Sequence, residues 1–171
     1  MKSNLLIFVT KRLAVRRYNL DDAETLYEYS RQTSNKELPN EILDTIEHAK
    51  TYVEMAIHSC RMGHFPIRYA IVLKENNKMI GALSYKATPE RGVQLTLMIA
   101  EEYQNHGYAS EITPVAIDYA KRMEGIDTIY AFVRLGNKPA ISVAEKSGFI
   151  QIDEFEADWF CNREVFRKYK I

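Results

Sequence analysis

A glycine-containing loop before a helical segment carries the clearest chemistry in this sequence. Residues 93–100 are an apolar run typical of a buried strand, and from Ile112 apolar side chains recur every three or four residues, as in a helix. Between them lies Tyr103-Gln104-Asn105-His106-Gly107-Tyr108-Ala109-Ser110-Glu111. The first N–H groups of a helix have no intrahelical acceptor and form the positive end of its dipole. Because Gly107 permits close backbone approach and Ala109 adds little bulk, this loop predicts a phosphate-bearing ligand.

A second motif follows further along the chain, in Asn137-Lys138-Pro139-Ala140 and Glu145-Lys146-Ser147-Gly148-Phe149. Together with Gln104-x-x-Gly107-x-Ala109, it resembles the GNAT superfamily of acetyl-CoA-dependent N-acetyltransferases. In that family the first motif cradles the pyrophosphate of coenzyme A, and the asparagine of the second lies beside the pantetheine arm. The resemblance therefore implies acetyl-CoA as the acetyl donor. It also implies these cofactor-binding residues: Gln104, Asn105, His106, Gly107, Tyr108, Ala109, Ser110 and Asn137.

The resemblance also covers the start of the chain and the strand before the loop. Thr10-Lys11-Arg12-Leu13-Ala14-Val15-Arg16 is similar to the opening of the ribosomal-protein N-terminal (alanine) acetyltransferase subgroup. The family pattern implies that the strand over 93–100 splays from its neighbour, and that main chain near Met98, Ile99 and Ala100 hydrogen-bonds to pantetheine. It further implies that a backbone N–H near Met98 or Ile99 stabilises the oxyanion formed by acetyl transfer.

The usual acid and base of the family are missing from their expected positions. Gln94 stands where many relatives carry a carboxylate, and Ala140 and Ala144 stand where they carry Ser or Tyr. No catalytic residue is assigned from the sequence, and Asn137 is kept as a candidate. Four tyrosines could donate a proton, but each is also explained as a half-buried core aromatic. They are Tyr85, Tyr103, Tyr108 and Tyr130.

The absence of the usual general base restricts which acceptor amine can react. An α-amino group has a pKa of about 7.7–8.0, whereas that of a lysine side chain is about 10.4, so only the former is substantially neutral at pH 7. We therefore predict an N-acetyltransferase that acts on a protein N-terminal α-amine or a small-molecule primary amine by direct attack in a ternary complex. The alternative is an acyl-CoA-binding sensor or scaffold with weak or no catalysis, and the residues at 94, 140 and 144 favour it.

The order of predicted elements is strand, two helices, three strands, helix, strand, helix and two strands. It predicts an α/β fold with a mixed, mostly antiparallel sheet of about seven strands, flanked by about four helices and containing one parallel crossover. This agrees with the GNAT acyl-CoA N-acyltransferase fold over a single domain, residues 1–171. The first strand is expected over 10–18, with an extension back to Leu5 left open. The second helix is expected from Glu41, and a loop near the substrate mouth over 32–40. Pro114 is expected to kink the central helix.

Composition restricts the partners. Lys plus Arg and Asp plus Glu both total 23, so no basic excess indicates nucleic acid. The sequence shows no leader and no long apolar run, which predicts a cytoplasmic protein without a membrane partner. Cys60 and His64 could share a zinc ion only if their helix continued past Gly63, so no metal site is predicted. Dimerisation is left open.

Overall fold

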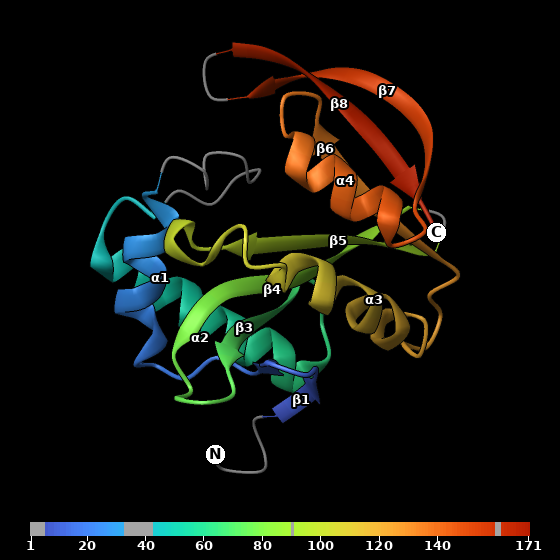
Figure 1. Ribbon diagram of the computed structural model, residues 1–171. Helices are drawn as coiled ribbons and strands as arrows, with labels where there is room; N and C mark the ends of the chain where they lie inside the picture. The colour runs from blue at the N-terminus through green and yellow to red at the C-terminus, as the bar shows by residue number, and fades with distance from the viewer. Residues whose placement is uncertain (1–5, 33–42, 90, 160–161) are drawn as a thin grey trace.

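One sheet of eight strands forms the centre of the computed structural model, in the order β1-β2-β3-β4-β5-β6-β8-β7 (Figure 1). The structure describes residues 6–32, 43–89, 91–159 and 162–171. The strands are β1 (Leu6–Val9), β2 (Leu13–Arg16), β3 (Ile67–Leu73), β4 (Met79–Thr88), β5 (Gly92–Ile99), β6 (Thr128–Arg134), β7 (Ile150–Trp159) and β8 (Asn162–Lys170). The α-helices are α1 (Asp22–Ser30), α2 (Ile46–Met62), α3 (Tyr108–Ala120) and α4 (Lys138–Lys146). The mixed α/β fold and the predicted order of elements after residue 18 are thereby confirmed.

The first predicted strand is wrong in its extent, which accounts for the eighth strand. The Thr10 N–H donates to the Leu13 carbonyl at 2.9 Å, and this turn divides the segment into the antiparallel pair β1 and β2. Likewise α2 begins at Ile46 and not at Glu41, because the side chain of Thr45 accepts the His48 N–H and caps the helix. Residues 41 and 42, like most of the predicted 32–40 loop, lie outside the described residues.

The end of α2 separates the two side chains of the zinc hypothesis. Gly63 adopts φ 68° and terminates the helix after Met62, as the sequence predicts. Cys60 therefore lies in the last turn, whereas His64 follows the left-handed residue. The i, i+4 arrangement on one helical face that a shared zinc ion would require does not form.

Helix α3 passes through Pro114 and continues to Ala120. Proline cannot donate the bond that would reach the carbonyl of Ser110. The preceding Thr113 hydroxyl donates to the Ala109 carbonyl at 2.7 Å, within the same turn. The proline therefore does not end the helix, and the kink itself stays a prediction.

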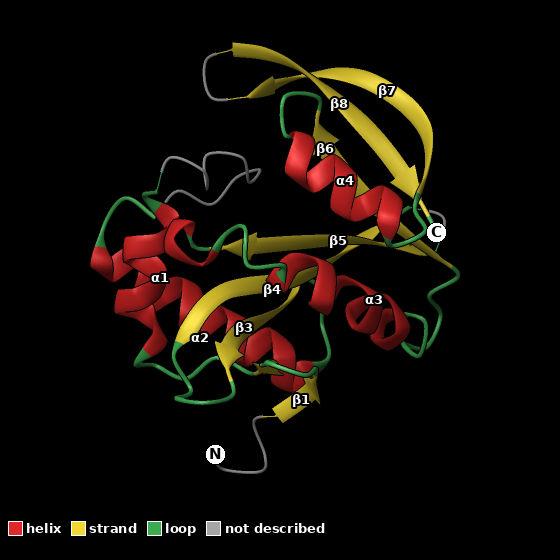
Figure 2. Cartoon of the chain, in the orientation of Figure 1, coloured by secondary structure: helices red, strands yellow, loops and turns green. Residues whose placement is uncertain are grey.

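Alternation along the strands places different helices on the two faces of the sheet (Figure 2). On β5, Val93, Leu95 and Ile99 join the core cluster that contains residues of α3 and α4. Met98 and the following Ala100 join the cluster that contains residues of α1 and α2. Successive side chains of a strand point to opposite faces, so β5 contributes to both cores at once.

The ladder between β5 and β6 is short. These parallel strands pair only at Gly92 with Thr128, Val93 with Ile129, and Gln94 with Tyr130. Beyond this point β6 continues antiparallel to β8 as far as Arg134. Figure 1 shows β6, β8 and β7 diverging from β5 toward the top of the view. The edge of β5 after Gln94 is therefore open, in agreement with the expected splay.

A buried ion pair fixes α1 to the sheet. Arg16 on β2 donates from both terminal nitrogens to the carboxylate of Asp22, at 2.7 and 2.8 Å, and their side chains are 4% and 7% exposed. The same carboxylate accepts the Asn19 N–H at 2.8 Å. Asn19 thus donates its backbone N–H to Asp22, and the N-cap residue of α1, Asp21, makes no side-chain capping bond.

We expect Asp22→Asn to lower the free energy of unfolding by about 3 kcal/mol, because it leaves the Arg16 guanidinium buried without a counter-charge. Urea denaturation measures the change. Asp21→Asn is the matched control, since Asp21 is exposed and makes no capping bond, and it should change stability by about 0.5 kcal/mol or less. Equal losses in the two variants would contradict a structural role for this ion pair.

Candidate active site

The loop between β5 and α3 turns through two left-handed residues. After a short 3-10 turn at Glu101–Tyr103, Asn105 has φ 61° and Gly107 has φ 77°, and α3 begins at Tyr108. Gly107 is the N-cap residue of α3, and no side chain accepts a capping hydrogen bond there. The N–H groups of the first turn have no intrahelical acceptor and point out of the helix start. This arrangement fits the pyrophosphate of coenzyme A, because backbone donors and the helix dipole both favour an anion there.

Two side chains of the predicted cofactor loop make contacts within the protein. The side-chain amide of Gln104 donates to the Ile99 carbonyl at 2.9 Å, which attaches the loop to the end of β5. His106 Nδ1 lies 2.6 Å from the Gln104 carbonyl oxygen, and its ring stacks on Tyr108 with centroids 5.7 Å apart. These contacts stabilise the turn that orients the first N–H groups of α3.

A network from the β1–β2 turn supports the same helix start. The carboxylate of Glu111 accepts the Thr10 hydroxyl at 2.5 Å, the Arg12 N–H at 2.7 Å and Arg12 Nε at 2.7 Å. The Arg12 guanidinium also lies 4.4 Å from the centroid of the Tyr108 ring. Sequence reasoning missed this network, although the opening Thr10-Lys11-Arg12 was already recognised as similar to that of the subgroup.

Charge and hydrogen bonding compete at Glu111. Burial raises the pKa of this carboxyl, but the hydrogen bonds from Thr10 and from the backbone and side chain of Arg12 outweigh it and lower the pKa below its ordinary value. Glu111 therefore remains ionised in the first turn of α3, where a negative charge stabilises the helix.

The open edge of β5 presents backbone groups of alternate residues. The Ala100 N–H donates to the Ile80 carbonyl at 2.9 Å, so it is directed toward the β4 side. Bonds alternate along an antiparallel strand, so Met98 faces the same way, whereas Leu97 and Ile99 face the open edge. By this parity the N–H groups of Leu97 and Ile99 are directed at the splay, and that of Ala100 is not. The contact of pantetheine with main chain near Met98, Ile99 and Ala100 stays a prediction.

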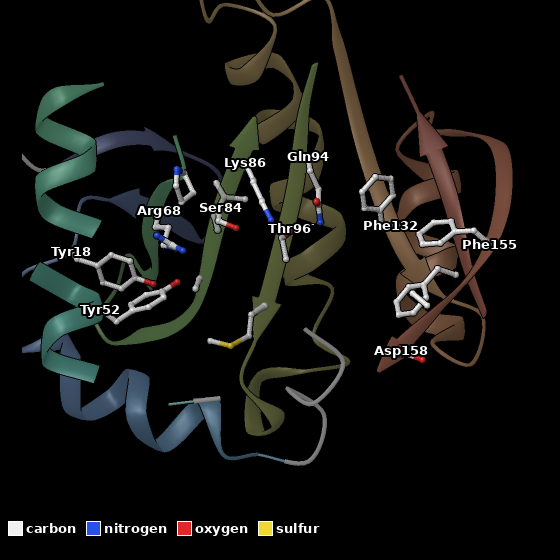
Figure 3. A pocket seen from close by; sticks show the side chains of 16 residues that line it. Tyr18, Tyr52, Arg68, Ser84, Lys86, Gln94, Thr96, Phe132, Phe155 and Asp158 are labelled. Carbon is white, nitrogen blue, oxygen red and sulfur yellow. Dashed lines mark hydrogen bonds between the residues drawn. The ribbon is translucent and has the colours of Figure 1, made fainter. Parts of the chain in front are cut away.

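A cavity of about 540 Å³ lies on the face of β5 opposite α3 (Figure 3). Its floor comes from β3, β4 and β5, and one side comes from α2. The other side is formed by β6, β7 and β8, which lie beyond the point where β5 and β6 separate. Aromatic rings from both sides enclose it: Tyr18, Tyr52, Phe132, Phe155 and Phe166.

Gln94, which stands where many relatives carry a carboxylate, lines this cavity. Its side-chain amide nitrogen donates to the hydroxyl oxygen of Thr96 at 3.3 Å. An amide cannot act as a general base. Among the described residues that line the cavity, the one carboxylate belongs to Asp158 on β7.

Ala140 and Ala144, which stand where relatives carry Ser or Tyr, have structural roles here. Ala144 is buried in the core, and Ala140 packs against that core. Asn137 caps α4 by accepting the Ala140 N–H at 3.1 Å, and both its contact with the cofactor and its part in catalysis stay predictions. The Tyr85 hydroxyl donates to the Ala116 carbonyl at 2.8 Å in the core, and burial raises the pKa of Tyr85 above its ordinary value. Tyr85 is therefore a structural residue.

In the part of the chain that the structure describes, no three His, Cys, Asp or Glu side chains gather into a group that could hold a metal ion. Among the same residues, no helix is both long and apolar enough to cross a membrane.

Comparison with known proteins agrees with this geometry. The sequence model for the acetyltransferase (GNAT) domain matches residues 12–150. The chain is 27% identical over 140 residues to the uncharacterized N-acetyltransferase YnaD of Bacillus subtilis, which covers 81% of this chain and 79% of that protein. RimL, a ribosomal L7/L12 α-N-protein acetyltransferase solved with coenzyme A, shares the fold with a TM-score of 0.85 at 17% identity, over 97% of each chain. A spermidine N-acetyltransferase of Vibrio cholerae, solved with coenzyme A and spermine, gives 0.80 at 18%, over 94% of this chain and 95% of that one.

The chain therefore belongs to the GNAT acetyltransferase family. It is an acetyl-CoA-dependent N-acetyltransferase, and acetyl-CoA is its acetyl donor. The resemblance seen in the two sequence motifs is confirmed by the match over most of the chain.

We expect Gly107→Ala to raise the dissociation constant for coenzyme A about tenfold, because a Cβ at positive φ strains the loop beside the phosphate site. Isothermal titration calorimetry measures this constant. Gly125→Ala is the matched control, since Gly125 also has φ 77° but lies at the far end of α3, and neither added Cβ meets an atom closer than 3.4 Å. Both variants should lose about 1 kcal/mol of stability. Equal affinities in the two variants would contradict the placement of the phosphate site.

Glu111→Gln should lower the melting temperature by about 2–4 °C at neutral pH, because the amide cannot replace the carboxylate in its network. A carboxyl with a lowered folded-state pKa contributes stability above its unfolded pKa and loses it as the pH falls through the folded value. The difference from wild type should therefore shrink as the pH falls below the ordinary pKa of a glutamate, about 4.3. Calorimetric scans at several pH values measure it, with Glu124→Gln, an exposed carboxyl after α3, as control. A difference independent of pH would count against the network.

Proposed function

We propose that this enzyme acetylates a primary α-amine, of a protein N-terminus or a small molecule, by direct attack in a ternary complex. One observation carries the proposal: the open edge of β5 lies between a helix-start anion site on one face and a cavity on the other. An acyl donor and an amine could therefore approach the same strand from opposite faces.

Residues of the chain take distinct parts in this arrangement. The first N–H groups of α3, at Tyr108, Ala109 and Ser110, would hold the pyrophosphate. The Leu97 and Ile99 N–H groups, directed at the open edge, would contact the pantetheine arm and stabilise charge on the thioester carbonyl oxygen. A preorganised backbone donor is effective in this role, because the strand that carries it does not reorganise during the reaction.

The reaction balances without a redox partner. Acetyl-CoA supplies an activated acyl group as a thioester. The nitrogen of the acceptor forms a bond to the acyl carbon, the carbon–sulfur bond breaks, and the proton lost by the amine ends on the thiol. A thiol with a pKa of about 8.5 can leave largely as thiolate, so a dedicated acid contributes less than it would for a poorer leaving group.

The acceptor amine must be substantially neutral without help from a protein base. Gln94 cannot remove a proton, and Asp158 is the one carboxylate among the described residues of the cavity. An α-amine with a pKa of about 7.7–8.0 is appreciably neutral at pH 7, whereas a lysine side chain near 10.4 is almost entirely protonated. This favours an α-amine over a lysine side chain or a polyamine.

An amine panel at pH 7 tests the proposal. A short peptide with a free α-amine, the same peptide with only a lysine amine free, and spermidine are compared by thiol release and by the mass of the acetylated product. The α-amine should react at least about tenfold faster per unit enzyme, which reflects its larger neutral fraction. Preference for the lysine peptide or spermidine would overturn the proposed acceptor. Coenzyme A binding without thiol release from any amine would favour the sensor alternative.

A further inference from the structure

One face of the strands β6, β8 and β7 lies against helices, and the other face lines the acceptor cavity. On β6, Ala131 and Val133 belong to the core cluster that contains residues of α3 and α4. Successive side chains of a strand point to opposite faces, so Phe132 points away from that core. It lines the cavity together with Phe155 on β7 and Phe166 on β8, and these three rings form an aromatic wall. Figure 3 shows Phe132 and Phe155 beyond β5.

The rings of the aromatic wall hold one another in place. Phe155 stacks on Phe166, with centroids 5.7 Å apart, and meets Phe132 edge to face at 5.8 Å. Phe166 is buried, whereas Phe132 and Phe155 are half-buried. Their orientation is therefore fixed before a ligand arrives, while part of their apolar surface stays accessible from the cavity. Covering such surface with an apolar group is favourable, because it removes both surfaces from water.

The floor of the cavity has a different character where it meets the open edge of β5. Gln94 and Thr96 line it from β5, and Ser84 and Lys86 line it from β4. These polar side chains suit an amine that approaches the strand, because a polar group that leaves water needs hydrogen-bond partners. The phenylalanine rings offer none. A ligand that fits both surfaces therefore has an amine at one end and an apolar group at the other.

The size of the cavity also favours a large substituent. Its volume of about 540 Å³ falls within the range of about 300–1,000 Å³ that is typical of sites enclosing a whole small ligand. A methyl or hydroxymethyl side chain beside the amine would leave most of this volume to water. A ring or a branched aliphatic chain would fill more of it and would cover Phe132 and Phe155.

We propose that the acceptor carries a large apolar group on the carbon next to its amine, and that this group packs against Phe132 and Phe155 while the amine lies at the open edge of β5. This inference rests on the proposed function and specifies its substrate class. The first residue of a peptide and a small-molecule amine both supply this chemistry. Phe132 and Phe155 determine specificity in either case and take no part in proton transfer.

Matched acceptors isolate the apolar group. Peptides of one sequence that begin with Phe, Leu, Gln or Ala all present an α-amine, so their ratios of kcat/KM report mainly the first side chain. The amides of free phenylalanine and free alanine form a second pair without a peptide chain. The wild-type enzyme should favour Phe over Ala, and Leu over Gln, by at least about tenfold. Selection within either set supports the inference, and the set that shows the larger ratio identifies the source of the amine.

Substitutions in the aromatic wall test its two accessible rings. Phe132→Gln and Phe155→Gln should each reduce the Phe-to-Ala ratio about threefold or more, whereas Phe132→Leu and Phe155→Leu should keep it within about twofold, because leucine remains apolar. Phe8→Gln is the matched control and should keep the wild-type ratio. Phe8 is also half-buried, but its ring packs on Tyr119 of α3, with centroids 5.4 Å apart. Coenzyme A affinity, measured by calorimetry, should stay within about twofold in every wall variant.

The outcomes separate this inference from the proposed function. Equal kcat/KM values across the peptides and across the two amides would overturn the inference and leave the α-amine acetyltransferase in place. A Phe-to-Ala ratio that is unchanged in both Gln variants would also overturn it. The acceptor series on the wild-type enzyme decides the question even where a variant fails to fold. If coenzyme A binds and no α-amine is acetylated, the proposed function itself fails.

Discussion

The backbone groups that β5 cannot share with β6 are the constraint on which the site depends. A buried N–H or carbonyl left without a partner costs about 1–3 kcal/mol, so an open strand edge must find other partners. β6 is committed to β8, and packing of the Phe132, Phe155 and Phe166 rings holds that side together. At the end of β5 the Gln104 side chain satisfies the Ile99 carbonyl. The remaining edge is therefore suited to a ligand with its own amides, as the pantetheine arm has.

In the proposed reaction, the same edge separates the acetyl donor from the acceptor. Strand backbone lies in the plane of the sheet, so groups at Leu97 and Ile99 are accessible from both faces, while the side chains around them belong to one face each. The face with α3 supplies the helix start, held by the contact of Glu111 with the β1–β2 turn. The face with α2 supplies the cavity. A change at the helix start would therefore affect binding of the acetyl donor, and a change in the cavity would affect binding of the acceptor.

Local patterns were sufficient for much of this architecture. The helix start after Gly107 and the end of α2 at Gly63 each follow from a few adjacent residues whose backbone preferences agree. The division of β1 from β2 was missed, because the turn at Thr10 contains neither Gly nor Pro. The direction of the Leu97 N–H depends on hydrogen-bond parity, and the gathering of Tyr52, Phe132 and Phe155 around one cavity depends on contacts between distant segments. Neither is encoded by neighbouring residues.

The amide at position 94 leaves the proposed reaction without a protein base at that point of the cavity. Lys86 lies directly opposite Gln94 in the β4–β5 ladder, and cross-strand side chains at that spacing interact. Under the proposed function, the positive charge of Lys86 would disfavour the protonated form of an amine bound nearby, because like charges destabilise one another. An acceptor amine of low pKa therefore fits this part of the cavity better than an amine that must lose its proton to a protein base.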